Sequence, residues 1–168
     1  LVTAANAVTA TADAGDITVG SITAGTTINV TATLGSINDA QDDLLADFTA
    51  AGLITLTARD EIGGTAPAAA NDPAQKLEFA AGSQVDASST TAGNITIRGL
   101  GAITLVDVDT VDGAIDVVAA GQITATDVQA GGGAGDNVVL NTTTGGIVAT
   151  LVTAANAVTA TADAGDIT

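Results

Sequence analysis

The first eighteen residues, Leu1-Val-Thr-Ala-Ala-Asn-Ala-Val-Thr-Ala-Thr-Ala-Asp-Ala-Gly-Asp-Ile-Thr18, return without a change as residues 151–168. A match of this length between the two ends of a 168-residue chain indicates a tandem repeat with a period of 150 residues. We therefore expect one complete repeat over residues 1–150 and the start of the next over residues 151–168. Because repeats at a fixed period determine the architecture, the fold has to be sought inside the period.

A shorter unit recurs inside the long one and begins with an alternating strand, as in Val8-Thr-Ala-Thr-Ala12. Successive side chains of a strand point to opposite faces, so the aliphatic residues would face a core and the threonines solvent. The leading aliphatic residues are Val8, Ile28, Ile54, Ile95, Ile115, Val138 and Val158, at steps of 20, 26, 41, 20, 23 and 20 residues. We interpret each step as one coil, which gives six coils per repeat.

A second aliphatic residue follows each of the first six markers by eight or nine residues. These residues are Ile17, Ile37, Ile62, Ile103, Ile123 and Ile147. Four coils carry a third aliphatic residue five positions later, at Ile22, Val108, Val128 and Val152. Three short strands per coil of about 20 residues predict an all-β fold, a right-handed parallel β-helix (β-solenoid) in which these residues stack as core ladders.

Glycine precedes several of these strands, at Gly15, Gly35, Gly101, Gly113 and Gly121. We expect a positive φ at these corners, which other residues resist. An antiparallel β-sandwich or barrel also uses short strands with regular turns, and it is the competing fold. Its tight hairpins favour Asn-Gly or Asp-Gly, however, and only Asp112-Gly113 offers such a pair. The pattern therefore favours the β-solenoid.

The charge balance is strongly acidic, with 19 Asp and Glu against 3 Lys and Arg, no His, and a net charge of −16. Without the duplicated tail, 17 acids and 3 bases leave −14 per repeat. Nucleic acids and anionic membrane surfaces both attract basic residues, so we expect neither as a partner. Hydrophobic residues make up 46% of the chain, which is enough for a core. The sequence contains no run of about 20 apolar residues, so we expect no membrane insertion.

Three stretches carry a resemblance to a known family. Residues 77–97, Leu-Glu-Phe-Ala-Ala-Gly-Ser-Gln-Val-Asp-Ala-Ser-Ser-Thr-Thr-Ala-Gly-Asn-Ile-Thr-Ile, with residues 51–58 and 113–124, resemble the repeats of filamentous-haemagglutinin-type adhesins. The similarity extends over most of the chain. It implies right-handed parallel β-helices, export to the bacterial surface, and a role in adhesion or as a rigid stalk. We therefore expect an extracellular or cell-surface protein, although the family's amino-terminal secretion motif does not occur in these residues.

These features predict a structural function, the repeat unit of a long fibre or adhesin shaft. Its partners would be further copies of the same repeat, because the ends of a solenoid are unpaired strand edges. The alternative is a calcium- or carbohydrate-binding adhesin module. We expect no enzyme, since the chain has neither His nor Cys. A polysaccharide-acting enzyme would need converging carboxylates and a basic residue in a groove.

The acidic run Asp107-Val-Asp-Thr-Val-Asp-Gly-Ala-Ile-Asp116 is the candidate metal site. Carboxylates of Asp107, Asp109, Asp112 and Asp116 would supply the oxygen ligands that Ca²⁺ prefers. Against this, Val111 stands where a calcium loop would carry its third ligand. No cofactor is required, and Ca²⁺ is the one ion that the residues suggest. Six coils at about 4.8 Å span roughly 29 Å, so divalent cations should also collect along such an acidic shaft.

Two insertions, near residues 39–47 and 63–76, interrupt the coils and are expected to form surface loops that contact neighbouring shafts. The first would form one helical turn that packs Leu44 and Leu45 on the solenoid. The second contains both prolines and therefore has to leave the sheet. In addition, Asn29, Asn94 and Asn141 each begin an Asn-x-Thr sequence, the pattern of N-glycosylation.

Overall fold

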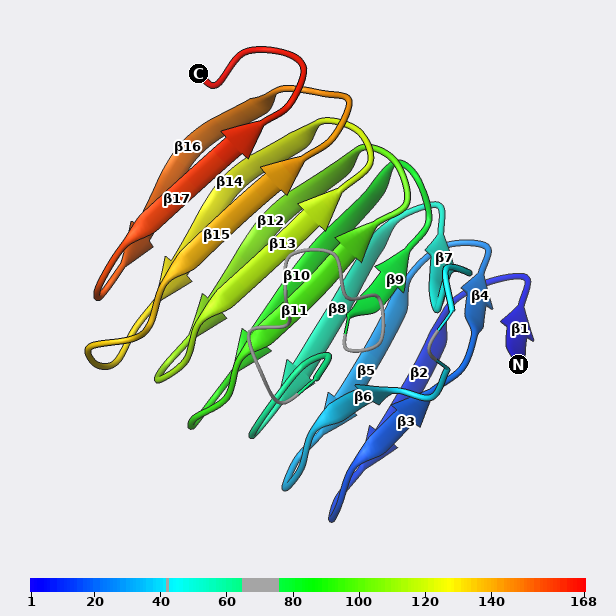
Figure 1. Ribbon diagram of the computed structural model, residues 1–168. Helices are drawn as coiled ribbons and strands as arrows, with labels where there is room; N and C mark the ends of the chain where they lie inside the picture. Colours follow the sequence, from blue (N-terminus) through cyan, green and yellow to red (C-terminus); the bar gives the residue numbers. More distant parts are fainter. Residues whose placement is uncertain (42, 65–75) are drawn as a thin grey trace.

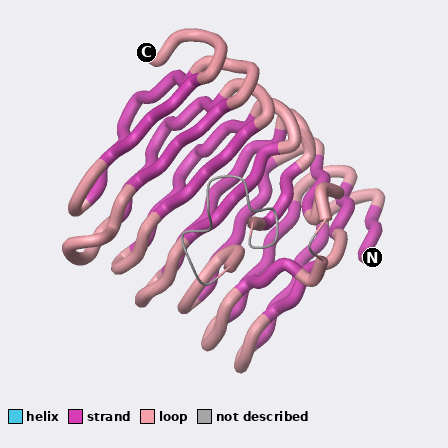
Figure 2. Tube along the Cα trace, viewed as in Figure 1, coloured by secondary structure: helices cyan, strands magenta, loops and turns pink. Residues whose placement is uncertain are grey.

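The computed structural model describes residues 1–41, 43–64 and 76–168, which form a parallel β-solenoid (Figure 1). The chain winds between two long sheets that enclose the core, and strands and loops account for all of the described residues (Figure 2). In this part of the chain, no helix is long and apolar enough to cross a membrane. The predicted fold class is therefore confirmed, with about three strands in each coil.

The strands fall into two long sheets and one short ladder. Sheet A contains, in order, β1 (Val2–Ala4), β4 (Ile22–Ala24), β7 (Phe48–Ala50), β9 (Leu77–Phe79), β11 (Ile95–Gly99), β13 (Ile115–Ala119), β15 (Val138–Thr142) and β17 (Val158–Ala162). Sheet B contains β2 (Val8–Ala12), β5 (Ile28–Ala32), β8 (Leu53–Ala58), β10 (Ser83–Ser89), β12 (Ile103–Thr110), β14 (Ile123–Ala130) and β16 (Ile147–Ala154). A short ladder of β3 (Ile17–Val19) and β6 (Ile37–Asp39) continues through Ile62 into β11.

Alternation within the strands places the core as predicted. In β5, Ile28 and Val30 are buried whereas Asn29 is exposed. The only two aromatic residues, Phe48 and Phe79, are fully buried in adjacent coils, with ring centroids 5.1 Å apart. Burial of one aliphatic or aromatic side chain contributes about 1.5–3 kcal/mol. A stack of such positions along the axis therefore holds the coils together.

The predicted ladders are correct on either side of the 41-residue step and wrong across it. Val8, Ile28 and Ile54 stack as expected, and so do Ile95, Ile115, Val138 and Val158. Across the step, however, the partner of Ile54 is Val85, whereas Ile95 lies beside Ile62. Ile17, Ile37 and Ile62 thus belong to the ladder of Ile95, and Ile103, Ile123 and Ile147 belong to sheet B.

The ladders change partners because the strands of a coil are distributed differently between the two sheets before and after the 41-residue step. Near the N-terminus the single five-residue strand lies in sheet B (β2, β5), whereas later it lies in sheet A (β11, β13, β15, β17). Between the two regions, β9 and β10 follow each other without such a strand between them. From Ile54 to Ile95 the chain therefore makes one and a half turns. From Val8 to Val158 it crosses between the sheets thirteen times, which is six and a half turns per repeat.

The corner glycines are needed for a different reason than predicted. Of the five, only Gly15 has a positive φ, of 89°. At Gly35, Gly101, Gly113 and Gly121, an added Cβ would lie 2.2 to 2.6 Å from an atom of the neighbouring coil. Coils are spaced about 4.8 Å apart, so a side chain pointing along the axis has no room. These four positions require glycine because the coils approach closely.

The helical turn predicted in the first insertion is wrong. Asp39 accepts a hydrogen bond from the Gln41 amide, and Asp43 accepts one from the Leu45 amide, both at 2.8 Å. Such local side-chain bonds compete with helix formation. Leu44 and Leu45 are 54% and 72% exposed and do not pack on the solenoid. Of the second insertion, residues 65–75 lie outside the described residues.

Candidate metal centre

Both insertions replace the same corner of sheet A in adjacent coils. In the first coil, two residues connect β3 to β4 at this corner. In the next coils, the first insertion connects β6 to β7, and the second lies between Ile62 and β9. Since Ile37 pairs with Ile62 and Phe48 with Phe79, the two insertions begin and end beside one another.

Two acidic side chains are stacked at the point where the insertions return to the sheet. Asp47 directly precedes Phe48, and Glu78 directly precedes Phe79. Because the phenylalanines point into the core, the preceding acids point outward. The Asp47 amide donates to the Glu78 carbonyl at 2.9 Å, and the Glu78 amide donates to Oδ2 of Asp47 at 2.9 Å. The two acids are therefore fixed side by side by the backbone.

A third carboxylate, that of Asp39 at the end of β6, completes the cluster. One carboxylate oxygen from each of Asp39, Asp47 and Glu78 lies within 4.8 Å of the others. Glu78 is 0% exposed and Asp47 3%, whereas Asp39 is half-buried. Neither side-chain oxygen of Glu78 accepts a hydrogen bond from any residue in the described ranges 1–41, 43–64 and 76–168. A buried charge without a partner is costly, so this cluster calls for a proton or a cation.

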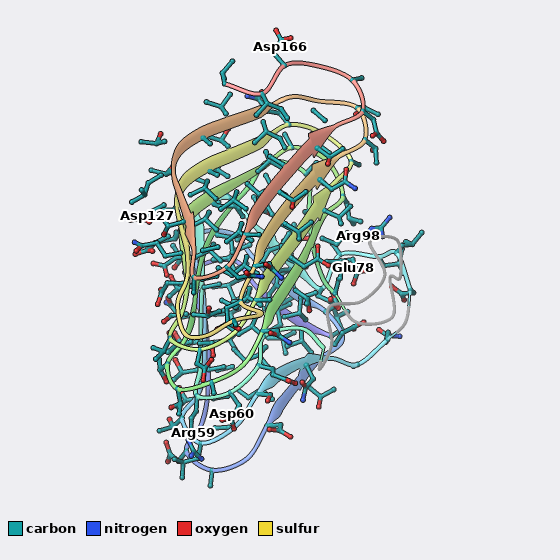
Figure 3. The ribbon with its side chains drawn as sticks, turned by 60° about the vertical axis from the view of Figure 1, so that its left-hand side comes forward. Arg59, Asp60, Glu78, Arg98, Asp127 and Asp166 are labelled. Atoms are coloured by element: carbon teal, nitrogen blue, oxygen red, sulfur yellow. The ribbon has the colours of Figure 1, made fainter. Side chains whose placement is uncertain are left out.

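The electrostatics of the cluster agree with its burial. Burial raises the pKa of Asp47 to about 7, and the charges of Asp39 and Asp43 add to the effect. Burial also raises the pKa of Glu78 to about 9, reinforced by the neighbouring Asp47 and opposed by Arg98. Arg98 lies in β11 directly beside Glu78 in the register, and Figure 3 shows both on one side of the solenoid. At neutral pH the cluster therefore retains protons unless a cation replaces them.

The structure does not bring the four predicted metal ligands together. Asp107 and Asp109 lie on the outer face of sheet B in β12, whereas Asp112 lies in the following turn. Asp116 lies in β13 of sheet A, where it forms a buried ion pair of 2.5 Å with Lys76. These residues are close in sequence, but the chain turns after β12, so Asp107 and Asp109 lie in sheet B and Asp116 lies in sheet A.

On sheet B, Asp107 belongs instead to a row of acids on successive strands. It is the register partner of Asp86, and Ser88 donates to Asp109 at 3.2 Å. Burial, and then the charge of Asp107, raise the pKa of Asp86. Burial raises the pKa of Asp109 as well, opposed by the Ser88 hydrogen bond and reinforced by Asp107, Asp86 and Asp127. This row concentrates negative charge, and each of its members is at least partly exposed.

The three predicted glycosylation residues lie in different surroundings. Asn29 is exposed on β5. Asn141 is half-buried on β15. The side chain of Asn94 accepts a hydrogen bond of 2.8 Å from the Ala114 amide in the next coil, so it takes part in stacking. Their modification stays a prediction.

Sequence reasoning missed Asp39, Asp47 and Glu78 as a group. A signal was present, because each of the only two phenylalanines directly follows an acid. Two such pairs in register necessarily stack their acids. The spacing of the aliphatic residues, however, does not predict the register of the strands across the insertions.

Comparison with known proteins reveals no matching family model, curated protein or solved structure. The resemblance to filamentous-haemagglutinin-type adhesins therefore stays a prediction. What the structure establishes is a parallel β-solenoid of about seven turns.

Proposed function

We propose that this chain is a repeat unit of a long secreted or cell-surface β-solenoid, a fibre or adhesin shaft. One observation carries the proposal: residues of the second copy continue the coils of the first. All five residues of β17 pair with β15, from Val158 with Val138 to Ala162 with Thr142. Ile167 then pairs with Ile147. The second copy thus pairs with the first through the same parallel strand pairing that joins coils within one copy.

The two ends of the chain support continuation in both directions. At the N-terminal end Leu1 and Val2 are 93% and 49% exposed, and at the C-terminal end Val158 and Ile167 are 47% and 51% exposed. Val8, which has the same repeat position as Val158 but carries a coil above it, is only 8% exposed. A further coil would bury these side chains and pair the open strand edges.

The mechanism is mechanical. Parallel pairing runs along the axis, and a repeat of six and a half turns at about 4.8 Å per turn is roughly 31 Å long. An outer surface with −14 per repeat keeps shafts apart at low salt. Divalent cations would reduce this repulsion and let the exposed first insertion contact a neighbour. The cell-surface location is supported by the resemblance described above.

Chains of one, two and three repeats test the proposal by small-angle X-ray scattering. We expect the maximum dimension to grow by about 31 Å per repeat at constant cross-section. As a control, a flexible Gly/Ser linker inserted between residues 150 and 151 should abolish this regular increase, because it breaks the stacked joint. If the unmodified chains scatter like flexibly linked beads, the shaft proposal is wrong.

A calcium- or carbohydrate-binding module is the second candidate, and the cluster of Asp39, Asp47 and Glu78 favours its calcium form. The same carboxylates are a poor basis for catalysis. Asp47 and Glu78 are buried under the surface, whereas a general acid or base has to reach its substrate. We therefore keep the proposal structural rather than enzymatic.

A further inference from the structure

We propose that Asp39, Asp47 and Glu78 bind one divalent cation, calcium in preference to magnesium, at the corner where the two insertions meet the solenoid. The proposal concerns a single repeat and does not depend on the formation of a longer shaft. It also differs from the site predicted at Asp107–Asp116, whose residues lie apart.

The three ligand oxygens lie close enough together for one ion to contact all of them, since each is within 4.8 Å of the others. Ca²⁺ binds oxygen ligands at 2.3–2.6 Å in a flexible geometry and accepts several carboxylates. Mg²⁺ demands near-ideal octahedral geometry, gives up its waters reluctantly and is usually held by only one or two carboxylates. A cluster of three carboxylates, two of them buried, therefore suits Ca²⁺ better. Without His or Cys, the donor set offers no nitrogen or sulfur ligand for zinc or copper.

The surroundings of Glu78 point to a ligand more strongly than the acids alone. Its side chain is fully buried and points toward Asp39 and Asp47, and within the described residues neither of its oxygens has a hydrogen-bond partner. Arg98 is the basic residue whose charge acts on Glu78, but the described part of the chain shows no ion pair between them. A divalent cation would supply the missing partner for both Glu78 oxygens and offset the repulsion among the three acids.

The cluster is also held in place, unlike the acidic row on sheet B. Two hydrogen bonds, from the Asp47 amide to the Glu78 carbonyl and from the Glu78 amide to Oδ2 of Asp47, fix two of the three ligands together with the stacked rings of Phe48 and Phe79. Preorganised ligands bind with a smaller entropic cost. Asp127, on the opposite side of the solenoid (Figure 3), is partly exposed to solvent and should attract cations only diffusely.

Isothermal titration of the metal-free 168-residue chain with CaCl₂ tests the proposal, at an ionic strength of about 0.15 M to screen diffuse attraction. We expect one saturable site per chain and a rise in Tm with Ca²⁺. Glu78→Gln should abolish the saturable phase, and Asp39→Asn should weaken binding at least about tenfold. Asp127→Asn removes the same charge at a distance and should leave the stoichiometry and affinity unchanged.

Several outcomes would overturn the proposal. One is a Glu78→Gln chain that still binds one equivalent of Ca²⁺, and another is a wild-type chain that shows only non-saturating uptake. Equal affinity for Mg²⁺ would refute the assignment to calcium. Circular dichroism confirms that each variant is folded. If Glu78→Gln is not, Asp39→Asn decides, since the half-buried Asp39 lies at the edge of the cluster. None of these results bears on the length increments expected for multi-repeat chains.

Discussion

Ile17 and Ile167 occupy the same position in successive copies of the repeat, yet they lie in opposite sheets of the solenoid. Ile17 pairs with Ile37, in the ladder that continues through Ile62 into β11 of sheet A. Ile167 pairs with Ile147, the first residue of β16 in sheet B. Identical sequences thus form opposite faces, because a repeat of six and a half turns returns the chain to the far side.

In a longer array, the corner that carries the insertions should therefore alternate between two sides of the shaft. A gold label on Leu44→Cys in each of several repeats should appear on one side every second repeat, about 62 Å apart. Leu44 is suitable because it is 54% exposed. Electron microscopy of the labelled array is the measurement. Labels along a single side at about 31 Å intervals would show that the repeat makes a whole number of turns.

The half-turn can also be tested within one chain by disulfide formation. Thr55 and Asp86 are register partners in β8 and β10, and the chain has no natural cysteine. We expect Thr55→Cys with Asp86→Cys to form a disulfide on mild oxidation, since neighbouring strands bring Cα atoms within bridging range. Thr55→Cys with Thr96→Cys is the matched pair that a 41-residue coil would bring together. Non-reducing electrophoresis distinguishes the two, and efficient bridging of the second pair would contradict the structure.

Close approach between coils predicts contrasting effects of alanine at two glycines. In Gly113→Ala the Cβ would lie 2.2 Å from the carbonyl oxygen of Gly93. We expect the free energy of unfolding to fall by about 2 kcal/mol or more, as in overpacked cores. At Gly133 the nearest atom is 4.0 Å away and φ is not positive. Gly133→Ala should therefore stay within about 0.5 kcal/mol of wild type in urea unfolding. Equal effects would mean that close packing between coils is not what requires glycine.

Stability without divalent cations should fall as the pH rises from about 6 to about 9. Asp47 and Glu78 have native pKa values of about 7 and about 9, raised by burial, with Asp39 and Asp43 adding and Arg98 opposing. The folded chain thus holds protons that the unfolded chain has released, so the stabilisation is complete below the unfolded pKa of about 4 and is lost progressively until the pH exceeds the native values. Urea unfolding in EDTA at several pH values measures the effect. Glu78→Gln cannot release a proton and should flatten this dependence; an unchanged slope would contradict the assignment.

The open end formed by β17 should make the isolated chain associate as its concentration rises. Val158 is 47% exposed there and faces the position of a further coil. Val158→Lys places a charge at this edge and should weaken association, because inward-pointing charges block edge pairing. Val111→Lys makes the same change at a residue that is 56% exposed in a turn. Sedimentation velocity should separate the two variants. A wild-type chain that stays monomeric at high concentration would remove the basis for end-to-end assembly.

The local pattern of the sequence was sufficient for the class of fold. Alternation in stretches such as Val8–Ala12 determined which side chains are buried, since a strand has a fixed period of two. The duplicated end predicts a tandem array with a period of 150 residues. The alternation depends only on neighbours along the chain, where geometry leaves little choice.

Only the tertiary structure decided the register across the insertions and the site that depends on it. A 41-residue step is compatible with one coil or with one and a half, because the insertion within it carries no periodic pattern of aliphatic residues. The partner of Ile54 is therefore Val85 and not Ile95. The same register stacks Phe48 on Phe79, and with them Asp47 on Glu78. Contacts between coils depend on how many half-turns the chain has completed, and side-chain periodicity does not record that number.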